Sequence, residues 1–441
     1  EVVNPFRSAE EEIKIGVKVF RVNDRIMQTK NTAKVSNGDL GFIRYIKDDE
    51  DGKRVGLDFG VGRELEYSVE DNGYVNIKSD KGLKVMQLTD VHIGGGWMSI
   101  KKDAMAINTV ATMIRVEKPD FVVVTGDISY PVPFQAGTFN NKSGAKIFAE
   151  LMETLGVYWT LAYGNHDTEA YSYYTREQLT DFYRSEQYKH CLLQPGPEDV
   201  DGVGNQVINI VNSDGVITRT LITLDSHSYI DGDVLGIRWL YDNIHENQIN
   251  WYKNVVLDLA KRNQDAAKAL PAAKQKSYAE LEKVVPTSVF FHFPMEEYRL
   301  AWTEYVENDY KDTKNVKYRY GLPGESGKVV YCGIHPDQLF ETMQELGSTD
   351  STFCGHDHYN NFSLNYKGIN LTYGYSIDYL AYVGIYKQGT QRGCTILDYD
   401  QNGGLDFHQE NYYQDKYQND ARESVTMQEI TTSGLPVLDA R

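Results

Sequence analysis

The sequence predicts an α/β domain with a largely parallel sheet, preceded by a small all-β unit. Three observations lead to this prediction. Short alternating strands separated by turn residues fill the first 75 residues, buried strands alternate with helical stretches from Leu83 onward, and metal-binding residue types follow almost every buried strand. Because the carboxyl ends of such strands lie at one edge of a sheet, we expect a functional site there.

The composition is that of an ordinary globular chain with an acidic surface. The 441 residues are 41% hydrophobic and 24% charged, with a formal net charge of -18, and this length suits one large and one smaller domain. The acidic excess disfavours general binding to nucleic acid or anionic membranes, although it leaves room for a local basic cleft. No apolar run approaches the roughly 20 residues that span a bilayer. Because the chain begins at Glu1 rather than Met, we expect that an N-terminal segment was either removed or left out of this sequence. We slightly favour a secreted or extracytoplasmic protein over a cytoplasmic one.

Residues 1–75 are expected to form a small β-barrel. Segments such as 18–21 and 39–43 have the alternating pattern of short strands. Several short strands at this spacing favour a barrel. The turn signals between the strands lie at 36–39, 49–52 and 71–73.

The larger domain is expected over residues 82–408. Its first elements alternate as strand 84–89, helix 103–116, strand 121–124, helix 145–155 and strand 157–161. Further apolar runs that extend the sheets lie at 221–224, 289–291, 351–354 and 395–397. Residues 262–285 are rich in Ala, Lys and Gln and are expected to form an exposed helical excursion, whereas the polar residues 409–441 suit a surface tail or a wrapping segment.

Five of the predicted strands end in residue types that bind metals. These ends are Asp90-Val91-His92, Gly126-Asp127, Gly164-Asn165-His166-Asp167, His292 and Gly355-His356-Asp357-His358. Each motif alone is explained as well by a turn, a helix cap or a buried structural histidine. Their joint occurrence, each at the end of a strand, favours a shared metal site.

This ordered set of motifs resembles that of the calcineurin-like metallophosphoesterases over roughly residues 82–400. The resemblance implies two packed mixed sheets flanked by helices, in four layers. The residues around 291–294 and 354–358 are most similar to the branch related to purple acid phosphatases. The resemblance therefore implies a hydrolase of small-molecule phosphate esters, either monoesters or diesters, with nucleic acid as a less favoured substrate.

The resemblance also implies a role for each motif. The ligands of two divalent or trivalent transition-metal ions would be Asp90, His92 and His358 for one ion, and Asn165, His292 and His356 for the other. Asp127 would bridge both ions with its two carboxylate oxygens, and a metal-bridging hydroxide would attack phosphorus. Imidazole and carboxylate ligands favour Mn, Fe or Zn over Ca or Mg. His166 would assist the leaving group, oriented by Asp167.

One position departs from the purple acid phosphatases. Those enzymes have glycine at the position of His92 and a tyrosine ligand at the position of Tyr130. Since one metal position does not accommodate both side chains, we expect His92 to be the ligand and Tyr130 to line the cleft, so the purple ferric-tyrosinate colour should be absent. Further candidates for binding substrate are Asp225, His227, Tyr373 and Tyr375.

Residues 11–15, 19–31 and 36–42 resemble a segment of RecD-like DNA helicases that forms a small barrel of the Src-homology-3 type. The sequence has no Gly-x-x-x-x-Gly-Lys-Ser/Thr loop, so no ATP-driven motor accompanies this segment. Its acidic and basic residues are mixed, which is not typical of a nucleic-acid-binding face. We interpret it as an accessory barrel of unknown role. Two alternatives to a small-molecule phosphoesterase stay open: a metal-dependent nuclease and a non-catalytic binding module.

Overall fold

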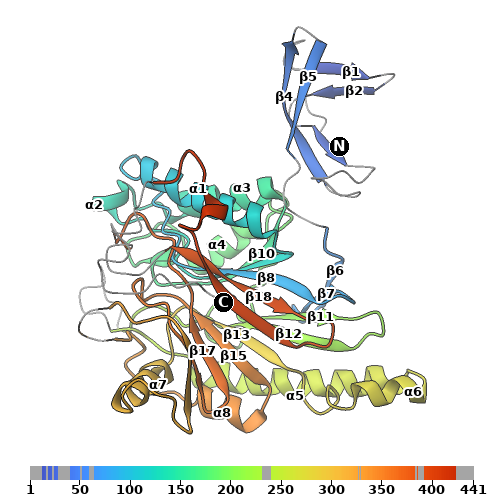
Figure 1. The fold of residues 1–441 in the computed structure, drawn as a ribbon, viewed down its shortest axis with the longest axis vertical. Coiled ribbons are helices and arrows are strands. Elements are labelled where there is room, and N and C mark those ends of the chain that lie inside the picture. Colours follow the sequence, from blue (N-terminus) through green and yellow to red (C-terminus); the bar gives the residue numbers. More distant parts are fainter. Residues whose placement is uncertain are drawn as a thin grey trace.

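Two large mixed sheets pack against each other, and helices cover their outer faces (Figure 1). The computed structural model describes residues 12–15, 18–21, 24–27, 40–49, 52–58, 64–230, 240–325, 327, 329–382, 385 and 392–423. Helices α1 and α3 lie on one side of the sheets and α5, α7 and α8 on the other (Figure 1). This four-layer arrangement confirms the predicted fold class. Among the described residues, no helix is both long and apolar enough to cross a membrane.

The first sheet has five strands in the order β10-β9-β8-β18-β19. Its strands are β8 (Leu83–Leu88), β9 (Phe121–Thr125), β10 (Tyr158–Ala162), β18 (Gly393–Tyr399) and β19 (Leu405–Asn411). Strands β8, β9 and β10 are parallel, whereas β18 pairs antiparallel with both β8 and β19. The three parallel strands therefore end at the same edge, immediately before the motifs at Asp90, Asp127 and Asn165.

The second sheet has nine strands in the order β14-β16-β17-β15-β13-β12-β11-β7-β6. In chain order they are β6 (Tyr67–Val69), β7 (Val75–Lys78), β11 (Gln206–Val211), β12 (Ile217–Thr223), β13 (Thr287–Phe290), β14 (Val316–Tyr320), β15 (Thr349–Cys354), β16 (Ser363–Tyr366) and β17 (Ile369–Tyr373). Strands β12, β13, β15 and β17 run parallel to one another. Their carboxyl ends carry the motifs at His292 and His356.

The helices end where the sequence supplies a suitable cap. They are α1 (Ile100–Glu117), α2 (Pro133–Ala136), α3 (Asn141–Leu155), α4 (Arg176–Tyr183), α5 (Glu246–Lys268), α6 (Ala272–Gln275), α7 (Glu296–Glu307) and α8 (Leu339–Leu346), with short 3₁₀ turns at His166–Thr168, Lys276–Tyr278 and Asp415–Tyr417. Gly156 closes α3 with a left-handed φ of 68°, which only glycine adopts without strain. Thr175 forms a capping box with Gln178 at the start of α4.

Three apolar clusters hold the layers together. Between the sheets, Val85 and Phe121 of the first sheet pack in one cluster with Leu221 and Phe353 of the second. A second cluster lies under α1, α3 and α4, and a third lies under α5, α7 and α8. Interiors packed on both faces in this way fix the positions of the strand ends, which therefore form a rigid platform for a site.

The N-terminal strands form two small antiparallel sheets. Strand β1 (Glu12–Ile15) pairs with β2 (Lys18–Arg21), and β3 (Arg25–Met27), β4 (Leu40–Asp49) and β5 (Gly52–Asp58) form an antiparallel sheet. This agrees with a small unit of the Src-homology-3 type. The turn predicted at 49–52 lies where β4 and β5 meet, while the turn predicted at 36–39 falls outside the described residues.

The boundary predicted at residue 75 differs from the structure. Strand β7 pairs in parallel with β11, and β6 pairs with β7, so both belong to the nine-stranded sheet. The reason is that a short strand of alternating residues has the same sequence pattern in a barrel as at the edge of a larger sheet. The packing of the whole fold decides which strand β7 pairs with, because Val75 and Ile77 are buried between the two sheets.

The segment after β19 packs against α1. Tyr412 and Tyr417 are fully buried, and the Tyr417 hydroxyl donates to Glu117 Oε1 at 2.6 Å. Lys416 pairs with the same carboxylate at 2.9 Å. Residues 412–423 therefore wrap over the first layer of helices, and residues 424–441 lie outside the described part of the chain.

Candidate metal centre

Ligand-type side chains from both sheets converge at their shared carboxyl edge. Four of them, Asp90, His92, Asp127 and His358, are buried and offer ligand atoms that all lie within 4.8 Å of one another. This is the group predicted for the first metal together with the bridging aspartate. The first three side chains follow β8 and β9 of one sheet, and His358 follows β15 of the other, so the centre depends on the packing of the two sheets.

The backbone turns sharply where these strands end. The φ angles of Asp90, His92, Asp127 and His356 are 50°, 53°, 56° and 73°, in the left-handed region that non-glycine residues rarely adopt. Such strain costs about 1–3 kcal/mol per residue and persists only where packing enforces it. The clustering of strained residues at one edge is typical of a functional site.

Asp127 occupies the middle of the cluster. Its Oδ2 atom lies 3.2 Å from His92 Nε2 and 3.2 Å from His292 Nε2, one residue from each predicted metal position. Its Oδ1 atom accepts a hydrogen bond from the backbone N–H of His166 at 2.8 Å. Its Oδ2 atom therefore faces an imidazole of each group. The expectation that both oxygens bridge the two ions stays a prediction, with Oδ1 keeping a second lone pair beside its hydrogen bond to the backbone.

The residues predicted for the second metal also lie together. His292 Nε2 is 3.1 Å from Asn165 Oδ1, and the rings of His292 and His356 are 5.2 Å apart. His292 Nδ1 donates to the carbonyl oxygen of Thr125 at 2.7 Å. This hydrogen bond leaves the lone pair of Nε2 facing Asn165 and Asp127, as a metal ligand requires.

Asp378 supports the first group and was missed from the sequence. Its carboxylate lies 3.1 Å from His358 Nδ1 and 3.7 Å from His92 Nδ1, and it accepts hydrogen bonds from the backbone of residues 380–382. It thereby orients the imidazole of His358 so that its Nε2 atom faces inward, whereas His92 Nδ1 is near the carboxylate without a hydrogen bond to it. Its position in the sequence could have identified it, because Asp378 follows β17, and the end of β17 is a sixth strand end at the same edge.

The electrostatics of the centre suit cations. Burial alone would raise the pKa of Asp127, but His292 and His166 hold it well below its usual range. Burial alone would lower the pKa of His292, but the Asp127 carboxylate raises it to about 9. Among the described residues, Asp90 Oδ1 is buried and accepts no hydrogen bond. His358 Nε2 lies 3.3 Å from this oxygen without meeting hydrogen-bond geometry, and a buried carboxylate oxygen without a hydrogen bond, facing imidazole nitrogens, suits a bound cation, so this donor set fits a metal pair.

His166 lies at the mouth of the centre, with its side chain 24% exposed. Its Nδ1 atom is 2.7 Å from Glu169 Oε1. Asp167, predicted to orient it, instead accepts hydrogen bonds of 2.9 Å from the backbone N–H groups of Asp127, Ser129 and Gly164. The geometry thus makes Glu169 the carboxylate that orients His166, while Asp167 ties the two ligand loops together.

Tyr229 links this pair to the second metal position. The Asn165 Nδ2 group donates to the Tyr229 hydroxyl at 2.9 Å, and that hydroxyl donates to Glu169 Oε1 at 3.2 Å. Because the amide nitrogen of Asn165 is engaged in this way, its Oδ1 atom is directed toward His292. Sequence reasoning missed both Tyr229 and Glu169, since neither stands at a strand end.

Tyrosine rings form the walls of the centre. The ring of Tyr130 stacks on His92 with centroids 4.6 Å apart, and its hydroxyl donates to Gln135 Oε1 at 2.7 Å. Tyr241 packs edge-on to His356 at 4.5 Å, and Tyr382 lies 4.4 Å from His358. Since its hydroxyl is directed to Gln135, Tyr130 lies in the geometry of a wall residue rather than a ligand.

The other four residues predicted to line the cleft lie outside the centre. Tyr373 and Tyr375 are fully buried, and the Tyr373 hydroxyl donates to Asp357 Oδ2 at 2.6 Å. Asp225 is buried in an ion pair with Arg176, which also donates to the Gly164 carbonyl oxygen at 3.0 Å and so braces the Gly164 loop. His227 bonds to Gln248 and stacks on another imidazole. The ion pair of Asp225 was not predictable, because Arg176 is distant along the chain.

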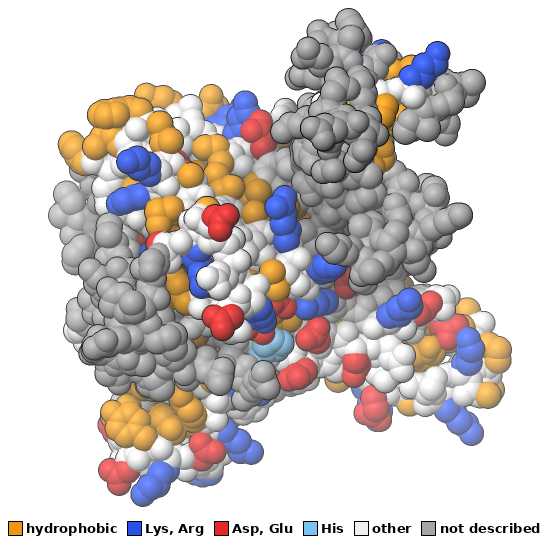
Figure 2. Space-filling view, turned by 45° about the horizontal axis from the view of Figure 1, so that its top comes forward, with side chains coloured by type: hydrophobic (Ala, Val, Ile, Leu, Met, Phe, Trp, Pro, Cys, Tyr) orange, Lys and Arg blue, Asp and Glu red, His pale blue; other side chains and the backbone are white. Residues whose placement is uncertain are grey.

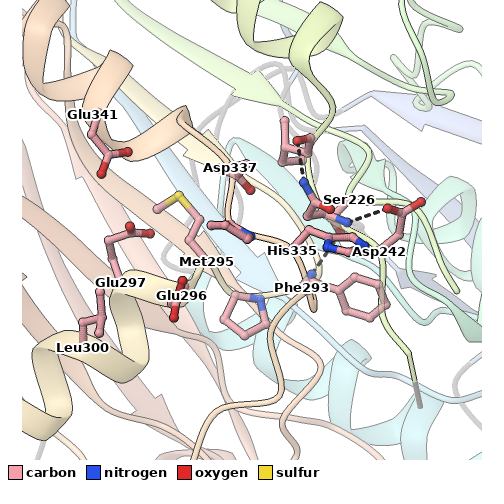
Figure 3. Close-up of a pocket in the computed structure, with 15 residues that line it drawn as sticks. Ser226, Asp242, Phe293, Met295, Glu296, Glu297, Leu300, His335, Asp337 and Glu341 are labelled. Carbon is pink, nitrogen blue, oxygen red and sulfur yellow. Dashed lines mark hydrogen bonds between the residues drawn. The ribbon is translucent and has the colours of Figure 1, made fainter. Parts of the chain in front are cut away.

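An acidic pocket of about 180 Å³ lies beside the centre (Figure 3). Phe293 separates the two, with its ring 4.6 Å from that of His356 and its backbone N–H donating to Ser226 Oγ. Glu297 and Asp337 line the pocket, and burial together with the neighbouring carboxylates raises the pKa of Glu297 to about 7. The acidic lining does not favour a phosphate in this pocket, which lies apart from the ligand cluster.

These features define the class of protein. The calcineurin-like phosphoesterase family matches residues 83–360, and the chain belongs to this family. Residues 1–59 match the SH3 domain of ATP-dependent RecD-like DNA helicases. The family holds two metal ions, which agrees with the two groups of ligands gathered around Asp127.

Several named relatives are similar to this chain. Probable inactive purple acid phosphatase 29 of Arabidopsis thaliana is 27% identical over 338 residues, which cover 72% of this chain and 77% of the relative. Probable inactive purple acid phosphatase 28 of the same plant is 24% identical, covering 70% and 73%. Phosphatase DCR2 of Saccharomyces cerevisiae is 28% identical, covering 65% and 46%. A dimetal phosphatase from Danio rerio matches in structure with a TM-score of 0.45 at 10% identity, covering 75% and 96%.

Proposed function

We propose that the chain is an active hydrolase of small phosphate esters that uses two transition-metal ions. The observation that carries the proposal is the complete donor set around Asp127 Oδ2, which lies 3.2 Å from an imidazole of each metal group. Loss of catalysis in a metal-dependent fold is expected first at such donors, and each predicted ligand position is filled here. The imidazole, carboxylate and amide donors favour Mn, Fe or Zn.

The residues of the chain divide the work of hydrolysis. When bound, the two ions supply positive charge for the phosphoryl oxygens and activate a water molecule. Asp127 sets the spacing of the two positions, and Asp378 keeps the Nε2 atom of His358 directed inward. The rigid strand ends hold these groups in place before the substrate arrives.

His166 is the group proposed to give a proton to the leaving oxygen. It is the partly exposed imidazole beside the centre, with its ring 5.3 Å from that of His92. Glu169 Oε1 lies 2.7 Å from Nδ1, so Nε2 is the atom proposed to face the substrate. Burial alone would lower the pKa of His166, but the carboxylates of Asp127 and Glu169 raise it, which favours the protonated ring that this role requires.

Turnover by metal-reconstituted protein tests the proposal. The full chain is stripped of metal, reloaded with Mn, Fe or Zn, and assayed with p-nitrophenyl phosphate, bis-p-nitrophenyl phosphate and single-stranded DNA. The proposal expects turnover of one or both small esters and its loss in Asp127→Asn. Asp120→Asn, a matched change at the start of β9 and away from the ligands, should retain it.

The same assay separates the alternatives. Cleavage of DNA with no turnover of either small ester would replace the proposal with the nuclease interpretation. The helicase-like segment at residues 1–59 is the feature that suggests this interpretation. Binding of two metal ions with no turnover of any substrate would favour a binding module. Two of the named relatives are called probable inactive phosphatases, so the assay also tests whether this chain has the activity that their names deny them.

A further inference from the structure

A group of large apolar side chains lies exposed beside the metal centre. We call it the rim surface, and its members are Trp97, Met98, Ile100, Phe134, Phe139 and Tyr173. Phe134 is 83% exposed and Trp97 is 73% exposed, whereas most side chains of these types are buried in globular proteins. Orange side chains gather with blue ones over the corner that contains α1 and α2 (Figure 2).

Contacts between three segments make the rim surface continuous. The Met98 N–H donates to the Ala136 carbonyl oxygen at 3.2 Å, and a Cβ atom built at Gly137 would lie 2.6 Å from Trp97 Nε1. The Tyr173 N–H donates to the Phe139 carbonyl oxygen at 3.3 Å, with the two rings stacked at 6.3 Å. An apolar surface of this extent rimmed by polar groups marks an interaction site.

The loop that carries Trp97 is held firmly. The buried carboxylate of Asp103 accepts hydrogen bonds from the backbone N–H groups of Gly94 and Gly95 at 2.8 and 3.0 Å, and from Ser99 Oγ at 2.7 Å. Trp97 and its neighbours therefore project outward because the backbone directs them there. A rigid projection of this kind suits insertion into a soft partner better than closure over a small ligand.

The charge around the rim surface is opposite to that of the whole chain. The chain has 63 acidic and 45 basic residues, yet the segments 91–102 and 128–149 contain four lysines and no acidic residue; of the acidic residues that directly follow them, Asp103 is buried and Glu150 pairs with Lys146 at 3.6 Å. The lysines are Lys101, Lys102, Lys142 and Lys146. Aromatic and aliphatic side chains flanked by lysine are typical of proteins that rest on an anionic lipid surface.

Two side chains, Gln135 and Tyr130, connect the rim surface to the metal centre. Gln135, next to Phe134 in α2, accepts from the Tyr130 hydroxyl at 2.7 Å, and the Tyr130 ring stacks on His92 at 4.6 Å. A surface bound at the rim would therefore lie close to the opening of the centre. We propose that the rim surface docks the protein on lipid bilayers that contain anionic headgroups, with Trp97 and Phe134 inserted at the level of the headgroups.

Vesicle co-sedimentation of the full chain tests this proposal without requiring turnover, so its failure is distinct from failure of the proposed activity. We expect binding to vesicles that contain phosphatidylserine and much weaker binding to phosphatidylcholine alone. The double variant Trp97→Ala/Phe134→Ala should weaken binding about tenfold or more. Lys101→Glu/Lys102→Glu should weaken it to a similar degree, since each lysine near an anionic surface contributes roughly fivefold.

Matched controls keep the test specific. Leu257→Ala/Tyr310→Ala removes two side chains that are 55% and 61% exposed on other elements, and it should bind vesicles like the wild type. No binding to anionic vesicles by the wild type overturns the proposal, as does equal weakening by the control. Self-association in sedimentation velocity that Trp97→Ala/Phe134→Ala abolishes, without vesicle binding, also overturns it and makes the rim surface a protein interface.

Discussion

Replacing Glu169 by glutamine removes the charge that orients His166 while keeping the size of the side chain. Glu169 is 5% exposed, and its Oε1 atom contacts both His166 Nδ1 at 2.7 Å and the Tyr229 hydroxyl at 3.2 Å. Glutamine can occupy the same space and still accept one hydrogen bond. The change therefore tests the carboxylate charge rather than the packing of the loop.

The expected loss depends on the leaving group. A positioned general acid contributes about 10²–10⁴ in rate, and a neutral amide retains part of the orientation, so we expect kcat to fall about 10–100-fold for phenyl or alkyl phosphates. A p-nitrophenolate group leaves without a proton, so kcat for p-nitrophenyl phosphate should fall about threefold or less. KM should change little for either substrate, because the effect lies in the transition state.

Steady-state kinetics with both substrates, together with the metal content of each protein, form the assay. Glu177→Gln, a matched change at an exposed position of α4, should leave both rates unaltered. An equal loss of kcat on the two substrates at normal metal content would refute the proton-transfer reasoning. A loss of metal in Glu169→Gln would instead indicate that the carboxylate acts through Tyr229 on Asn165.

Three further predictions concern the metal centre. Asp378→Asn should weaken metal binding about 10–100-fold in a chelator competition, because His358 loses the charge of its hydrogen-bonded carboxylate; unchanged affinity would contradict that role. Chelation of the metal should lower the Tm in calorimetry, since free metal at about 100 times Kd stabilises the folded state by about 2.7 kcal/mol, and an unchanged Tm in protein that binds the metal would contradict the site. Iron-loaded protein should show no visible tyrosinate band, and a band that disappears in Tyr130→Phe would reverse the assignment of His92 over Tyr130.

The ligand positions were predictable because their signals are local. Asp90, Asp127, Asn165 and His356 each stand directly after an apolar strand, and the edge where parallel strands end is fixed by topology. The order of the motifs along the chain then carried the resemblance to the family. Apolar patterning likewise indicated β8, β9, β10, β12, β13, β15 and β18 and the helices α1 and α3, whereas the remaining strands of the two sheets and most other helices were not predicted.

The supporting residues were not predictable, because their roles depend on contacts between distant segments. Asp378 was overlooked beside Tyr373 and Tyr375, which share its strand end but are buried. Glu169 was overlooked in favour of Asp167, whose carboxylate is occupied by three backbone N–H groups. A local pattern indicates which residue type is available, whereas the three-dimensional packing decides which carboxylate faces which imidazole.

The metal content of the purified full chain tests the central claim most directly. Elemental analysis after reconstitution should find two transition-metal ions per chain, and Asp127→Asn should hold fewer because the oxygen that faces both positions is altered. Asp120→Asn provides the matched control and should retain two. A wild-type protein that binds one ion or none, or an Asp127→Asn protein that still binds two with unchanged affinity, would contradict a dinuclear centre built around Asp127.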